Sequence, residues 1–318
     1  MPLLDLPKYD IPFYLRNGHV NTLYTYINRK PMVENVERRR HATYDGDFID
    51  VDYLFRGNNS VALLLHGLEG SSDSQYICGM ANYLSERHFD IAMINHRSCS
   101  GYINDTMTMY HSGFTQDVDL MAQLLSKQYD ELCIVGFSMG GNMALKYIGE
   151  GEYNLPDNLT KIAAISVPIA LSSSSKKLGH WKNYLYQHNF LKTLKKKAYE
   201  KQRQFPDKID KTIIENIKSL VDFDNHFTGP MHGFVDAEDY YARSSAKQFL
   251  SSVKIPALLI NALDDPFLTP ECFPYEIARD SDLFHFGAVR NGGHVGFYSR
   301  EYLGSYVEPV VYDWLAKS

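Results

Sequence analysis

The chain has 318 residues, of which 44% are hydrophobic and 13% aromatic, so it can bury one large core. Charged residues make up 22% and the formal net charge is −6, which argues against a nucleic-acid partner because dedicated binders are strongly basic. The four cysteines are scattered and form no C-x-x-C pair, which excludes a disulfide scaffold and suits a reducing compartment.

The amino-terminal sequence MPLLDLPKYDIPFYL contains two aspartates and three prolines, and it lacks the basic start and the apolar stretch of a signal peptide. The longest apolar runs, VALLL and IPALLI, have the length of a strand. A membrane-spanning helix needs roughly 18 apolar residues. We therefore expect no transmembrane segment and a cytoplasmic location.

The pattern at 41–55 favours two short strands joined by a turn at 45–47. From residue 60 onward, short runs rich in Val, Ile and Leu alternate with helical segments, as in βαβ units around a parallel sheet. The predicted strands are 60–67, 90–97, 131–138, 161–168, 254–265 and 283–289. The predicted helices are 74–88, 117–128, 139–149 and 300–318.

Residues 171–250 interrupt this alternation, and we interpret them as a helical cap inserted into one α/β domain whose core is 1–170 and 251–318. Large apolar and aromatic residues recur there at helical spacing, which indicates either packing or a wall that faces the substrate. They are Trp181, Tyr184, Leu185, His188 and Leu191. The lysines expected on the solvated side are Lys192, Lys195, Lys196, Lys197 and Lys201.

The motif G-x-S-x-G at 136–140 directly follows a predicted strand and directly precedes a predicted helix. In this context it is typical of a nucleophile elbow, a sharp turn that lifts the central residue, Ser138, above the sheet. The flanking glycines let the neighbouring backbone pass. They do not form G-x-G-x-x-G, which argues against a dinucleotide-binding turn, and no phosphate-binding G-K-[ST] loop occurs.

A serine hydroxyl needs a general base, and His294 in NGGHVGF follows the last predicted strand. The acid that orients this base is expected after the preceding strand, where NALDDPFLTP offers Asp264 and Asp265. The chain order Ser, Asp, His is the one that such a fold requires. We prefer Asp265, which stands last before the turn at Pro266, and we expect Asp264 to be a turn or capping residue.

Two backbone amides must bind the oxyanion of an acyl-transfer reaction. One is expected from Met139, directly after the nucleophile, and the other from Leu68 in the loop LLLHGLEGSS. His66 in the same loop is a rival base, but its early position in the chain favours a structural role.

Several ordered motifs resemble the YheT-like branch of the α/β-hydrolases, and together they cover nearly the whole chain. They are NGHVNTL, DGDFIDVDY, HGLEGSSDS, YHSG with Asp117, GFSMGGNMALKYIGE, ALDDPF and GGHVGF. The resemblance implies an eight-stranded α/β-hydrolase sheet with a triad of Ser138, Asp265 and His294. One stretch departs from the branch, because its usual Arg-Gly-Cys-Ser-Gly reads Arg-Ser-Cys-Ser-Gly at 97–101.

His111 and Trp181 are candidate substrate contacts. An acyltransferase-like H-x-x-x-x-D string needs four intervening residues, whereas five separate His111 from Asp117, so a structural role in the loop competes with a substrate contact. Trp181 would belong to the apolar wall of an acyl pocket if the inserted helices cover the triad.

These observations predict a serine hydrolase that cleaves a carboxylic ester or thioester of a small molecule or lipid through an acyl-enzyme intermediate. The predicted machinery requires no cofactor and no metal. Two alternatives stay open: an acyltransferase on the same triad, and a catalytically idle α/β-hydrolase scaffold used for binding.

Overall fold

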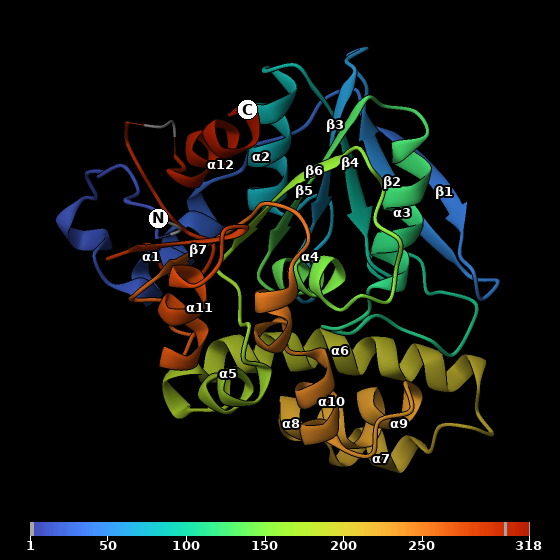
Figure 1. Ribbon diagram of the computed structural model, residues 1–318. Coiled ribbons are helices and arrows are strands. Elements are labelled where there is room, and N and C mark those ends of the chain that lie inside the picture. The colour runs from blue at the N-terminus through green and yellow to red at the C-terminus, as the bar shows by residue number, and fades with distance from the viewer. Residues whose placement is uncertain (1–2, 302–303, 318) are drawn as a thin grey trace.

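The computed structural model describes residues 3–301 and 304–317. Eight strands form one sheet in the order β1-β2-β4-β3-β5-β6-β7-β8 (Figure 1). The pairs β1–β2 and β2–β4 are antiparallel and all others are parallel, which confirms the predicted mostly parallel sheet. The strands are β1 (Glu37–Ala42), β2 (Phe48–Leu54), β3 (Ser60–Leu65), β4 (Phe89–Asn95), β5 (Glu131–Phe137), β6 (Leu159–Ile165), β7 (Ala257–Ala262) and β8 (Phe284–Val289).

Helices cover both faces of this sheet, with α2 (Gln75–Ser85) and α12 (Val307–Ala316) on one face and α3 (Gln116–Ser126) and α4 (Met139–Gly149) on the other. Outside these layers, α1 (Gly18–Asn28) and α11 (Tyr275–Arg279) were not predicted. No helix of the described residues has both the length and the apolar character that crossing a bilayer requires.

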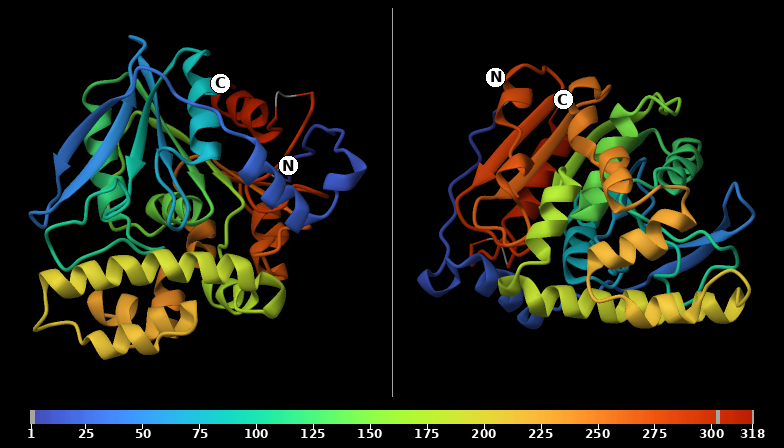
Figure 2. Two further views of the ribbon diagram at one scale, coloured as in Figure 1. Left: turned by 180° about the vertical axis from the view of Figure 1, so that it is seen from behind. Right: turned by 90° about the horizontal axis from the view of Figure 1, so that it is seen from below.

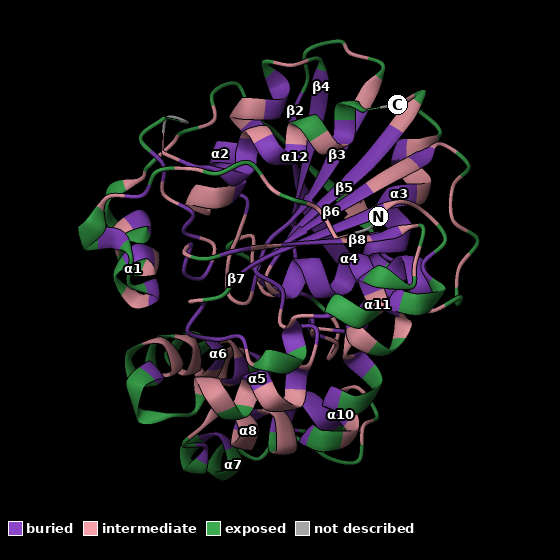
Figure 3. Ribbon diagram, turned by 60° about the vertical axis from the view of Figure 1, so that its left-hand side comes forward, coloured by how far each residue is buried: buried purple, intermediate pink, exposed green. Residues whose placement is uncertain are grey.

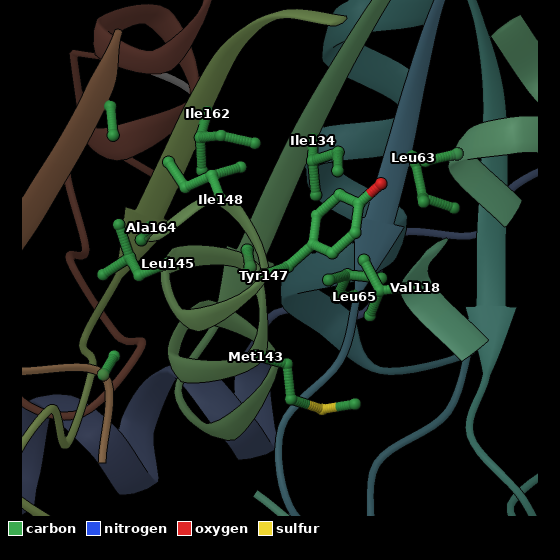
Figure 4. Close-up of a cluster of buried hydrophobic side chains, with 14 of the residues drawn as sticks. Leu63, Leu65, Val118, Ile134, Met143, Leu145, Tyr147, Ile148, Ile162 and Ala164 are labelled. Atoms are coloured by element: carbon green, nitrogen blue, oxygen red, sulfur yellow. The ribbon is translucent and has the colours of Figure 1, made fainter. Parts of the chain in front are cut away.

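The core explains why the central strands read as continuous apolar runs. Side chains alternate between the two faces of a strand. In β3, Val61, Leu63 and Leu65 join the cluster under α3 and α4, whereas Ala62 and Leu64 join the cluster under α2 and α12. Figure 4 shows part of the first cluster, and Figure 3 shows the central strands buried along their length. A strand packed on both faces must be apolar at every position.

Between β6 and β7 the chain leaves the sheet and forms a helical insertion, which lies across the carboxyl ends of the strands (Figures 1 and 2). Its helices are α5 (Leu171–Leu178), α6 (Tyr184–Gln204), α7 (Lys211–Asn216), α8 (Leu220–Phe223), α9 (Gly229–Met231) and α10 (Ala237–Ser244). The insertion has its own cluster, which includes Leu194, Ile214 and Phe223 and also takes in Met109 from the loop after β4. The division at 171–250 stays an interpretation of the sequence.

The predicted orientation of α6 and of the turn before it is wrong in part. Trp181, Tyr184 and Leu185 were expected either to pack or to form a wall facing the substrate, yet they are 74%, 59% and 66% exposed. Lys197 and Lys201 were expected in solvent, yet both are largely or fully buried. These two ammonium groups find partners on the core, and this is why that side of the helix turns inward.

The buried lysines of α6 bind polar atoms of two core loops. Lys197 Nζ lies 2.7 Å from the Glu69 carboxylate, and Lys201 Nζ donates to the carbonyl oxygens of Asn104 and Thr106. Buried charges persist in proteins where such partners replace water. The long helix is therefore held to the core by polar contacts as well as by its apolar cluster.

Ser98, which departs from the branch motif, has a φ of +63°, a conformation that glycine reaches most easily. The Asn104 side chain accepts a hydrogen bond from the Ser98 amide, and the Asn104 amide donates to Ser98 Oγ over 3.3 Å. These bonds hold a serine in a turn that glycine would adopt freely.

Candidate active site

Ser138 occupies a sharp turn between β5 and α4. Its φ and ψ are +52° and −119°, far from the regions that serine prefers. A Cβ on Gly136 would lie 2.5 Å from the Gly140 carbonyl oxygen, and one on Gly140 would lie 2.4 Å from the Leu65 carbonyl oxygen. No side chain fits at either glycine, so close packing of the backbone maintains the strained serine as in a nucleophile elbow.

The structure brings Ser138, His294 and Asp265 together in one hydrogen-bonded row. His294 Nε2 lies 2.9 Å from Ser138 Oγ, and His294 Nδ1 lies 2.9 Å from Asp265 Oδ2. The other Asp265 oxygen accepts from the Phe267 amide over 2.8 Å, and Asp265 is only 2% exposed. A buried carboxylate fixed in this way holds the imidazole with Nε2 toward the serine.

Asp264 points elsewhere. Its Oδ1 accepts from the amides of Gly292 and Gly293 over 2.8 and 2.9 Å, and Asn291 Nδ2 lies 3.2 Å from its Oδ2. This carboxylate therefore organises the loop that carries His294 and does not touch the imidazole.

Thr22 of α1 also supports the loop that carries His294, and the sequence did not predict this contact. Its Oγ1 accepts from the His294 amide over 2.8 Å and donates to the Gly18 carbonyl oxygen over 2.7 Å. The signal was present in the motif NGHVNTL, which carries part of the family resemblance but was assigned no role in the site.

The two predicted oxyanion donors flank the serine. A Cβ on Gly67 would lie 3.1 Å from Ser138 Cβ, so this loop passes directly beside Ser138. The amides of Gly67 and Glu69 donate to the hydroxyls of Tyr76 and Tyr110 over 3.0 and 2.9 Å. Within 3–301 and 304–317, the amide of Leu68 between them and that of Met139 at the start of α4 find no acceptor.

His66 is buried and both of its ring nitrogens are occupied. Nε2 accepts from the His96 amide over 3.1 Å, so Nδ1 carries the proton and donates to the Gly67 carbonyl oxygen over 2.7 Å. Burial lowers the pKa of His66 well below its usual value. This neutral, fully bonded imidazole stabilises the loop and has no nitrogen free to act as a base.

Two cavities meet at Ser138. The first, of about 140 Å³ and called here the apolar cavity, lies between the sheet edge and the insertion and is lined mainly by apolar side chains such as Leu194 and Phe227. The second, of about 430 Å³ and called the wider cavity, runs between α1, the loop 67–76 and α6. The residues common to both are Leu68, Ser138, Phe190, Phe267 and His294.

His111 lines the apolar cavity, and its contact with a substrate stays a prediction. The Gly113 amide donates to its Nδ1 over 3.1 Å, which leaves the proton on Nε2, and burial lowers the pKa of His111 well below its usual value. His111 is therefore a neutral donor beside the cavity. Asp117 instead pairs with the buried Arg97 over 2.8 Å, a structural contact.

Trp181 lines neither cavity, so the predicted substrate contact at this residue is wrong. The outward turn of the segment removes Trp181 from the site. Phe190 and Leu194, on the opposite side of α6, line the apolar cavity in its place.

A family model described as "alpha/beta hydrolase fold" matches residues 62–300. The protein named "Putative esterase YheT" of Escherichia coli (strain K12) is 29% identical over 94% of this chain and 90% of its own length. Phospholipase ABHD3 of Mus musculus is 31% identical over 86% of this chain and 68% of its own length. The Pyrococcus furiosus esterase Pf2001 has a TM-score of 0.59 at 14% identity, covering 96% of this chain and 98% of its own, and shows the fold alone. The chain thus belongs to the α/β-hydrolase fold family, in the YheT-like branch that its motifs resemble, and is a carboxylic ester hydrolase.

Proposed function

We propose that the chain cleaves carboxylic esters with Ser138 as the nucleophile and an acyl-enzyme as the intermediate. The observation that carries this proposal is the hydrogen-bonded row from Asp265 through His294 to Ser138, with 2.9 Å at both contacts of the imidazole. The row lies where the apolar cavity and the wider cavity meet, so an ester bound across the junction presents its carbonyl carbon to the serine.

In the first half-reaction, Ser138 Oγ bonds to the carbonyl carbon while His294 Nε2 takes the hydroxyl proton. The carbonyl oxygen becomes an oxyanion and accepts from the amides of Leu68 and Met139, next to the positive end of α4. The carbon–oxygen bond to the alcohol then breaks, and the leaving oxygen takes the proton from His294. Asp265 stabilises the transient imidazolium.

In the second half-reaction, a water molecule attacks the acyl-enzyme and gives its proton to His294. The second tetrahedral intermediate collapses, the carboxylic acid leaves, and the proton returns to Ser138 Oγ. Exposed residues such as Tyr26 and Asn189 line the wider cavity, which gives water a path to the serine. This access favours hydrolysis over transfer to another alcohol.

We assign the acyl group to the apolar cavity and the alcohol part to the wider cavity. A cavity of about 150 Å³ lined by Leu, Ile and Phe holds a benzene molecule. The apolar cavity, at about 140 Å³, therefore suits an acyl group of roughly six carbons. The wider cavity has room for a larger polar alcohol, in keeping with the name phospholipase of one relative.

A fluorophosphonate probe followed by peptide mapping tests the nucleophile, and a panel of esters graded by acyl length tests the pocket. We expect labelling at Ser138, its loss in Ser138→Ala, and a fall in rate on the order of 10⁴ or more without unfolding. Ser112→Ala is the matched control, because Ser112 lines the same cavity and its hydrogen bonds run through its backbone.

Three results would contradict the proposal. Absence of labelling together with absence of turnover would indicate an idle scaffold. Product formation that requires an added alcohol would indicate an acyltransferase. Activity of Ser138→Ala within tenfold of the wild type would exclude Ser138 as the nucleophile.

A further inference from the structure

Large exposed apolar side chains lie in and before α1 and at the start of α6, and both helices border the wider cavity. We call this surface the mouth patch. Its members are Phe13, Val20, Leu23, Tyr26 and Ile27 in and before α1, and Trp181, Tyr184 and Leu185 at the start of α6, with exposed fractions from 39% to 80%. Exposed apolar side chains gathered on neighbouring elements mark a site of interaction.

The two helices that carry the mouth patch are in contact through residues next to it. The rings of His19 and Tyr186 stack with their centroids 5.8 Å apart, and the Tyr186 hydroxyl lies 3.5 Å from the His19 carbonyl oxygen. Leu23 and Tyr26 also line the wider cavity. Viewed from below, α1 lies near the end at which α6 begins (Figure 2). The two parts of the patch therefore lie on elements that meet beside the wider cavity.

The charge of this surface is opposite in sign to that of the whole chain. Residues 176–204 contain nine Lys and Arg, of which five are exposed, and their one acidic residue is only partly exposed, although the net charge of the chain is −6. The exposed ones are Lys176, Lys182, Lys192, Lys196 and Arg203. Lys192 and Lys196 are exposed and lie seven and eleven residues after Leu185, on the same face of α6. Lys182 is exposed beside Trp181.

We propose that the mouth patch docks onto an anionic lipid bilayer. Trp and Tyr rings favour the headgroup level of a bilayer, aliphatic side chains enter its acyl boundary, and neighbouring lysines bind anionic headgroups. Trp181, Tyr184 and Leu185 supply the first two kinds of contact and Lys192 with Lys196 supplies the third. The docking itself does not depend on Ser138. Only its consequence, that the wider cavity opens toward lipid esters, rests on the proposed function.

Co-sedimentation with sucrose-loaded vesicles tests this inference, using the full chain in its Ser138→Ala form so that lipid hydrolysis cannot change the vesicles. The vesicles contain phosphatidylcholine alone or with about 30% phosphatidylserine, enough to make the surface anionic. We expect binding to the anionic vesicles and at least about tenfold weaker partitioning for Trp181→Ser/Leu185→Ser. Lys192→Glu/Lys196→Glu weakens binding to the anionic vesicles and leaves the weak binding to neutral ones unchanged.

The matched control is Tyr102→Ser/Val235→Ser, which removes two side chains that are 60% and 86% exposed elsewhere on the surface. It retains wild-type partitioning. Equal loss in the control and the patch variant, or no binding of the parent protein, overturns the proposal. A dimer in size-exclusion chromatography that Trp181→Ser/Leu185→Ser converts to a monomer also overturns it, because a second copy then covers the patch.

Hydrolysis of a water-soluble short-chain ester separates this inference from the proposed function. In the otherwise wild-type chain, Trp181→Ser/Leu185→Ser retains that activity while vesicle binding falls. If the wild-type protein shows no esterase activity but vesicle binding is intact, only the proposed function is overturned.

Discussion

The carboxyl edge of the sheet and the helical insertion hold their polar side chains by different means. At the edge, backbone groups do most of the positioning: a strained turn holds Ser138, and the amides of Gly292 and Gly293 bind Asp264. In the insertion, side chains bind distant partners, as Lys201 binds carbonyl oxygens of the loop after β4.

The difference predicts two kinds of sensitivity. Changes at the sheet edge affect the reaction far more than the fold, because Ser138 lies on the wall of a cavity and its removal leaves the core intact. Changes to the buried polar contacts of the insertion affect stability first, because they leave partners without a hydrogen bond. Substitutions in each region can break or sharpen this contrast.

The largest expected effect separates the two neighbouring aspartates. Asp265→Asn lowers kcat by roughly 10⁴, because an amide favours the wrong imidazole tautomer. Asp264→Asn lowers kcat far less and lowers Tm, because the amides that it binds lose a charged acceptor. Steady-state kinetics and thermal unfolding on both variants measure this. Reversed effects would mean that Asp264 orients His294.

The second prediction concerns pH and the insertion. Burial raises the pKa of Asp224 from 3.8 to about 6. A pKa above that of the unfolded chain means that this group stabilises the fold below about pH 4 and that the contribution is lost as the pH rises through 6. The shift corresponds to about 3 kcal/mol.

Asp224→Asn therefore removes most of this pH dependence, and urea unfolding at pH 4 and pH 7 measures the difference from the wild type. The control is Asp210→Asn, whose exposed carboxyl caps α7 and whose pKa is lowered by hydrogen bonds with Thr212. Asp210→Asn changes the dependence of the free energy of unfolding on pH in the opposite direction. An unchanged dependence of the free energy of unfolding on pH in Asp224→Asn would refute the role of this partly buried carboxyl.

The third prediction compares two lysines of α6. Lys201→Met leaves the Asn104 and Thr106 carbonyl oxygens without this donor and lowers the free energy of unfolding by about 1–3 kcal/mol. Lys196→Met changes it by less than about 0.5 kcal/mol, because Lys196 is exposed. Urea titration of both variants provides the measurement, and equal effects would contradict the inward orientation of Lys201.

The smallest expected effect is that of Trp181→Ala, which leaves both Tm and the preference for acyl length unchanged. Phe190→Ala is its counterpart, because Phe190 lines the apolar cavity. A methylene in a fitted pocket is worth about 1–3 kcal/mol, so this variant shifts the preference by about tenfold. Rates over the graded ester panel provide the comparison. If Trp181→Ala shifts the preference for acyl length and Phe190→Ala does not, the observed orientation of α6 is contradicted.

The sequence by itself predicted most of the sheet. Predicted and observed strand ends differ by at most three residues from β3 to β8, because apolar runs buried on both faces carry a local signal. The final helix was predicted over 300–318 but begins at Val307. Residues 302–303 of that prediction lie outside the described residues. The sequence also predicted the elbow at Ser138, because the residues that this turn requires lie within five consecutive positions.

The chain order of Asp265 and His294 followed from the strands that precede them, and the structure brings both to Ser138. Only the tertiary structure revealed the contact from Thr22, since α1 lies some 270 residues before the loop that it supports. Local patterns carry no information about such pairing.

The orientation of α6 was likewise decided only in the folded chain. A helical period identifies which residues share a face, but it does not identify which face is buried. Trp181 and Leu185 looked like the inner side because they are apolar, and Lys201 looked like the outer side because it is charged. The carbonyl oxygens of Asn104 and Thr106 and the carboxylate of Glu69 reversed this expectation, because they solvate the two lysines in place of water.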